Sequence, residues 1–84
     1  MTVARTWTVE VFIDEHEDER RTHAEAHLHT RDRTDLTGEG VAMRRPADAE
    51  VPEIGEELAV GRALADLSEQ LLTAAAGDIE QVAG

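Results

Sequence analysis

The sequence has no cysteine, no lysine and no tyrosine, and its 84 residues include only one tryptophan and one phenylalanine. The absence of cysteine excludes disulfides and thiol chemistry. Ser68 is the only serine, so few side chains are available for nucleophilic catalysis. Two aromatic rings also leave little for stacking on nucleic-acid bases. We therefore expect a protein that is not an enzyme and that carries no cofactor.

The sequence also lacks a long apolar run. No segment approaches the roughly 20 residues that a membrane-spanning helix needs. The opening MTVARTWTVEVF has no basic region followed by a long apolar stretch, which a signal peptide would show. These absences favour a cytoplasmic protein without membrane contact.

Negative charge is what the sequence has in excess. Nineteen acidic residues against eight arginines give a net charge of −11. Such a chain is repelled by bare nucleic acid and by anionic membranes unless its arginines are clustered. A protein or a ribonucleoprotein is therefore the partner that the charge favours.

Two segments alternate between apolar and polar residues, as half-buried strands do. The first covers about residues 6–13 and the second about 21–30, and the acidic run 14–20 between them is expected to be a hairpin loop. A third strand is expected over about 34–45. Its Gly38 and Gly40 share one face, which suggests that the covering helix approaches closely there. The apolar face of the first strand carries Trp7, Val9, Val11 and Ile13.

A long amphipathic helix is expected over about residues 52–76. Pro52 suits the first helical position, and Gly77 suits the position just after the last one, which leaves 77–84 as a tail. Gly61 lies on the apolar stripe of this helix, where we expect another backbone to approach closely.

These elements predict a single α+β domain over residues 1–84, in which a three-stranded antiparallel meander packs on one long C-terminal helix. A helix of 25 residues is about 37 Å long, whereas three strands side by side are only about 10 Å wide. The helix should therefore overhang its sheet, and an apolar overhang favours a homodimer. The predicted dimer interface consists of Phe12, Leu67, Leu71 and Leu72.

Three histidines of the second strand, His23, His27 and His29, lie on one face of the predicted sheet. Side chains two residues apart on a strand are about 7 Å apart, and zinc, nickel and copper accept imidazole ligands. Because Glu10 and Glu25 are the only further ligands in view, these histidines are either a metal site or an ordinary polar face.

Four arginines lie close together in the sequence: Arg31, Arg33, Arg44 and Arg45. They could form a small basic patch that contacts RNA. The other interpretation is that they pair with acidic neighbours such as Asp48 and Glu50.

The stretch LTGEGVAMRRPADAEVPEIGEELAVGRALADLSEQL, with WTVEVFIDE and THAEAHLHT before it, resembles a family of small, uncharacterised bacterial proteins. The resemblance covers nearly the whole chain. It implies a fold like that of double-stranded-RNA-binding domains (β-β-β-α), which is also similar to ribosome hibernation-promoting factors. It further implies a link to stress or dormancy and to the ribosome.

RNA binding does not follow from this fold. Domains of that type grip phosphates with a lysine-rich start of the last helix, whereas this chain has the acidic PEIGEE there. We therefore expect a non-enzymatic, homodimeric interaction protein, linked to stress and associated with the ribosome. The alternatives are direct RNA binding through the arginine patch and metal binding by the strand histidines.

Overall fold

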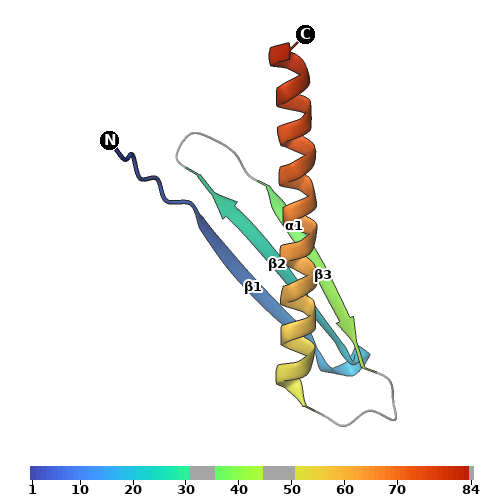
Figure 1. Cartoon of the computed structure of the whole chain (residues 1–84). Helices are drawn as coiled ribbons and strands as arrows, with labels where there is room; N and C mark the ends of the chain where they lie inside the picture. Colours follow the sequence, from blue (N-terminus) through green and yellow to red (C-terminus); the bar gives the residue numbers. More distant parts are fainter. Residues whose placement is uncertain (31–35, 45–50, 84) are drawn as a thin grey trace.

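The structure is a computed structural model that describes residues 1–30, 36–44 and 51–83. The chain forms β1 (Thr8–His16), a short 3₁₀ helix η1 (Glu17–Glu19), β2 (Arg21–His29), β3 (Thr37–Met43) and α1 (Pro52–Ala83), as Figure 1 shows. The strands make one antiparallel sheet in the order β1-β2-β3. The predicted α+β fold, an antiparallel meander followed by one long helix, is confirmed. No helix in the described part of the chain is long and apolar enough to cross a membrane.

The hairpin between β1 and β2 is tighter than predicted. β1 continues through His16, which pairs with Arg21, so part of the acidic run belongs to the strand and not to the loop. The chain reverses over η1 and Arg20, whose φ of 52° is left-handed. The Arg20 N–H donates to the Glu17 carbonyl at 3.1 Å, which closes the turn.

α1 packs on β2 and β3 through small residues. A Cβ atom added at Gly38 would lie 2.2 Å from the Ala63 carbonyl oxygen, and one added at Gly40 would lie 2.2 Å from the Ala59 carbonyl oxygen. The helix backbone therefore rests directly on β3, as the two glycines predicted. The buried core is made mostly of alanine: Ala24, Ala26, Leu28, Ala42, Ala59, Ala63 and Leu67.

The prediction for Gly61 is wrong. A Cβ atom added at Gly61 would meet nothing within 4 Å, so this glycine lies on the outer side of α1 and not at a close contact. The narrow contact requires glycine on the strand, because alanines already line the facing side of the helix at Ala59 and Ala63.

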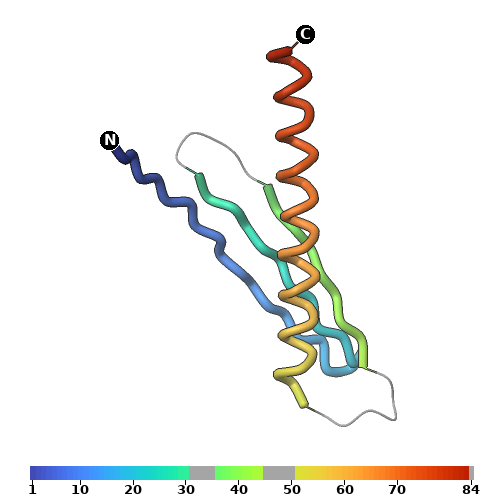
Figure 2. The backbone as a smooth tube through the Cα atoms, viewed as in Figure 1, coloured from blue at the N-terminus to red at the C-terminus, as the bar shows by residue number. Residues whose placement is uncertain are grey.

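The predicted helix end at Gly77 is also wrong, because α1 continues to Ala83. The segment 77–84 is therefore not a tail in its described part. Glycine inside a helix costs only about 1 kcal/mol relative to alanine, and the three residues before Gly77 are alanine, the best helix former. The C-terminal half of α1 projects beyond the sheet, as the backbone trace in Figure 2 shows.

Side chains of α1 close the outer edge of β3. Three residues spaced four apart on the helix bond to backbone groups on the side of β3 that faces away from β2. Arg62 donates to the Val41 carbonyl at 2.7 Å, Gln70 donates to the Thr37 carbonyl at 2.8 Å, and Asp66 accepts from the Glu39 N–H at 2.9 Å. Unpaired backbone groups on an edge strand invite pairing with another chain, and the helix removes that opportunity at β3.

Candidate functional site

β1 lacks the cover that α1 gives to β2 and β3. The helix crosses the sheet over β2 and β3, and most of β1 lies to one side of it (Figure 1). Val9 and Ile13 pair with Leu28 and Ala24, which are buried under the helix, so they face the helix side of the sheet. Val9 nevertheless keeps 40% of its surface exposed and Ile13 keeps 41%.

One flank of α1 extends this apolar area. Residues 62 and 66 reach the outer edge of β3. Residue 64 is two positions from each of them, which places it about 160° away around the helix. Leu64 therefore lies on the flank that faces β1, and it is 42% exposed. We call Trp7, Val9, Ile13 and Leu64 the β1 apolar surface. Trp7, just before the strand, is 58% exposed.

The backbone edge of β1 is open as well. The Leu28 N–H donates to the Leu36 carbonyl, and the Arg44 N–H donates to the Arg20 carbonyl. The backbone groups of the even-numbered residues of β2 therefore point toward β3. The odd-numbered residues of β2 therefore bond to the even-numbered residues of β1 with which they pair. The N–H groups of Val9, Val11 and Ile13 consequently point to the free edge. Among the described residues, no hydrogen bond closes that edge as α1 closes β3.

The predicted dimer residues are not brought together. Leu67 is 3% exposed and packs against Gly38, so its assignment to a dimer interface is wrong. Leu71 packs against the core and is half-buried, while Leu72 is 69% exposed on the projecting part of α1. Phe12 is 48% exposed on the sheet face opposite the helix, where its ring meets His27 edge-on at 4.9 Å.

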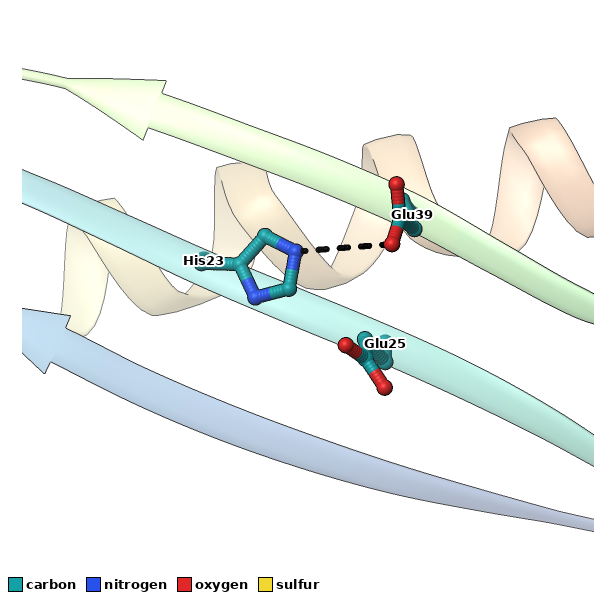
Figure 3. A group of neighbouring side chains, drawn as sticks. All are labelled: His23, Glu25 and Glu39. Atoms are coloured by element: carbon teal, nitrogen blue, oxygen red, sulfur yellow. Dashed lines mark ion pairs between the residues drawn. The ribbon is translucent and has the colours of Figure 1, made fainter.

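The sheet face opposite α1 carries histidines and carboxylates. The Nε2 atom of His23 lies 4.0 Å from Glu39 on β3, as Figure 3 shows. Glu25 joins them, and one ligand atom from each of the three residues lies within 4.8 Å of the others. On its other side, the Nδ1 atom of His23 lies 3.9 Å from Asp14 of β1.

The other two predicted metal ligands each contact a carboxylate and are not part of this group of three. The Nε2 atom of His27 contacts Glu25 at 2.9 Å, and that of His29 contacts Glu10 at 3.3 Å. The three histidines therefore do not converge on one ion in this structure. Sequence reasoning missed Glu39, although the strand register would have revealed it, because Glu25 and Glu39 lie directly opposite each other.

The cluster of His23, Glu25 and Glu39 has a chemical consequence. Like charges directly opposite each other on adjacent strands are destabilising. A divalent cation between the two carboxylates would relieve that repulsion, and the His23 imidazole supplies a nitrogen ligand beside them. Asp14 would then orient His23, and His27 would orient Glu25, as outer partners orient the ligands in metal sites.

The predicted arginine patch lies mostly outside the described residues. This holds for Arg31, Arg33 and Arg45. Arg44 is half-buried at the end of β3, beside a cavity of about 530 Å³ between the hairpin and the start of α1. Acidic residues line the same cavity, including Glu15 and Glu17, so the described part of this region is not a purely basic surface.

A three-stranded antiparallel sheet covered on one face by a single long C-terminal helix defines a class of small α+β proteins. The family described as Rv2632c-like matches residues 5–84 of this chain, and the chain belongs to that family.

Named relatives come from mycobacteria. Uncharacterized protein Mb1767 of Mycobacterium bovis (strain ATCC BAA-935 / AF2122/97) is 49% identical over 80 residues, which is 95% of this chain and 82% of the relative. Uncharacterized protein Rv2632c of Mycobacterium tuberculosis (strain ATCC 25618 / H37Rv) is 44% identical over 78 residues, or 93% of this chain and 81% of the relative. The crystal structure of Rv2632c matches with a TM-score of 0.85 and 42% identity, covering 96% of this chain and 93% of that one. The predicted membership of a small, uncharacterised family is therefore confirmed.

Proposed function

We propose that this protein is a non-enzymatic interaction protein that acts as a homodimer, with β1 as the interface. The observation that carries the proposal is the asymmetry between the two sheet edges. Side chains of α1 bond to the outer edge of β3, whereas β1 presents nine residues of open edge beside the β1 apolar surface. An edge of this kind is completed by a strand from another chain.

A second copy is the simplest source of that strand. Two identical edges related by a two-fold axis bury the same patch from each copy, and pairing would extend the sheet from three strands to six. The net charge of −11 on each copy opposes association. Salt screens charges beyond about 8 Å at physiological ionic strength, so the dimer should become stronger as salt is added.

Amide hydrogen exchange tests the interface directly. In a dimer paired through β1, the N–H groups of Val9, Val11 and Ile13 are hydrogen-bonded and should exchange slowly at high protein concentration. Dilution should accelerate their exchange, while amides in the β2–β3 ladder stay protected. The proposal fails if these three amides exchange at unprotected rates at every concentration.

The partner of the dimer is a protein or a ribonucleoprotein with a basic surface, because the chain is strongly acidic. The link to stress or dormancy and to the ribosome is part of this proposal, and it is supported by the sequence resemblance. Direct RNA binding through the arginines, and likeness to double-stranded-RNA-binding domains, stay predictions. The acidic start of α1, with Glu53, Glu56 and Glu57, argues against phosphate contact there.

A second candidate function is binding of a divalent ion by His23, Glu25 and Glu39. It is favoured by the approach of these three side chains, whose ligand atoms lie within 4.8 Å of one another. We expect zinc or nickel to raise the melting temperature of the protein. At a free ion concentration a hundred times the dissociation constant, the stabilisation would be about 2.7 kcal/mol.

Two histidine variants make the metal prediction specific. His23→Ala should abolish the thermal shift and the heat of binding in calorimetry, because it removes the nitrogen ligand. His29→Ala should leave both unchanged, because His29 pairs with Glu10 outside the cluster. Equal responses from the two variants, or no shift in the unaltered protein, would rule out this site.

A further inference from the structure

The sequence of β1 favours one register for its pairing with β1 of a second copy. From the register and charges of β1, we propose that two copies pair antiparallel with Val11 of one copy directly opposite Val11 of the other. This inference rests on the proposed homodimer and names its geometry. The register follows from the side chains that would lie opposite each other when the two open edges of β1 pair.

Only some registers pair residues whose side chains lie on the same face of the two sheets. Side chains directly opposite each other lie on the same face of a sheet, and a shift by one residue reverses the faces. In a symmetric dimer, one residue of β1 must therefore lie directly opposite its own copy, with the two-fold axis midway between them. The residues in the middle of the strand that can take this position are Glu10, Val11, Phe12 and Ile13.

Charge excludes two of these positions. Centring on Glu10 places this carboxylate opposite its own copy, and centring on Phe12 places Glu10 opposite Asp14 on both sides of the axis. Like charges directly opposite each other destabilise a sheet, and both copies are already strongly acidic. Centring on Val11 or on Ile13 places no acidic residue opposite another.

Apolar matching decides between the two remaining positions. Centring on Ile13 places Val11 opposite Glu15 and leaves Val9 beyond the strand of the partner. Centring on Val11 places Val9 opposite Ile13 on both sides of the axis, so that apolar residues meet apolar residues. Glu10 then lies opposite Phe12, Asp14 opposite Thr8, and Glu15 opposite Trp7.

The N-terminal residues add charge complementarity in this register. Residues 1–7 lead away from the sheet at the start of β1, as Figure 2 shows. Continued along the line of the strand, they bring Arg5 opposite Glu17 at the hairpin of the partner subunit. Both residues are exposed in the single chain. A two-fold axis perpendicular to the sheet also places both helices on the same face, where the two β1 apolar surfaces join.

Cysteine cross-linking tests the register, because the chain has no native cysteine. Single variants Glu10→Cys, Val11→Cys, Phe12→Cys and Ile13→Cys are each oxidised under mild conditions. Directly opposite Cα atoms in a hydrogen-bonded pair are about 5.5 Å apart, which is within the range of a disulfide. Val11→Cys should form a disulfide-linked dimer in high yield, and the other three should form it at least several-fold more slowly.

A double variant and the solution mass separate the possible failures. Val9→Cys with Ile13→Cys in one chain should also cross-link, whereas Val9→Cys alone should not, since identical positions there lie about 13 Å apart along the strand. A protein with twice the chain mass that cross-links best at another position would overturn the register and keep the homodimer. A single-chain mass at every concentration would overturn both.

Discussion

Replacing Gly40 by alanine should destabilise the protein by about 3 kcal/mol, which is a large fraction of what a small domain has. The added methyl group would lie 2.2 Å from the Ala59 carbonyl oxygen and 2.4 Å from the Ala63 nitrogen. Both are backbone atoms of α1, so no side chain can rotate away to make room. The helix would have to lift from β3, and the alanine core would lose its contacts. Denaturant unfolding followed by circular dichroism measures the change.

The same substitution elsewhere on the chain is the matched control. Gly61 lies inside α1, and a methyl group added there would meet nothing within 4 Å. Gly61→Ala should therefore stabilise the protein by about 1 kcal/mol through helix propensity alone. Similar effects of the two variants would show that α1 does not rest on β3 as described.

The glycines illustrate how far the sequence determines this fold. The alternation in β1 and β2 predicted the sheet, and Gly38 and Gly40 predicted where the helix would approach. Gly61 and Gly77 misled, because a glycine in a helical segment can mark a contact, an end or neither. The role of such a glycine depends on what packs against that side of the helix, and the sequence alone does not show which strand the helix covers.

The candidate site was less predictable than the fold, because it depends on register and on helix placement. Leu67 was expected on an overhang, yet the helix is shifted toward β3, so Leu67 is buried and β1 is left open. Glu39 was missed because its approach to Glu25 depends on the pairing of β2 with β3. Residues on different strands meet only when that pairing is known.

Replacing Val9 by proline should convert the dimer to a monomer. The Val9 N–H points to the free edge of β1, so proline there leaves the β1–β2 hydrogen bonds intact. Edge strands tolerate proline in this orientation. In the proposed dimer, however, this N–H is bonded to the partner subunit, and the proline ring would occupy its place. The far-UV circular dichroism spectrum should stay that of the unaltered protein.

Val9→Ile is the control for this variant. It keeps the N–H and the branched apolar side chain, so it should remain a dimer under the same conditions. If Val9→Pro and Val9→Ile have the same mass as the unaltered dimer, β1 is not the interface.

The most direct test of the central claim is the mass of the unaltered protein in solution, measured by light scattering after size-exclusion chromatography. The proposed homodimer should have a mass twice the 9.2 kDa of one chain at micromolar concentration. The fraction of dimer should increase as salt is added. A mass of one chain at every protein and salt concentration would contradict the account.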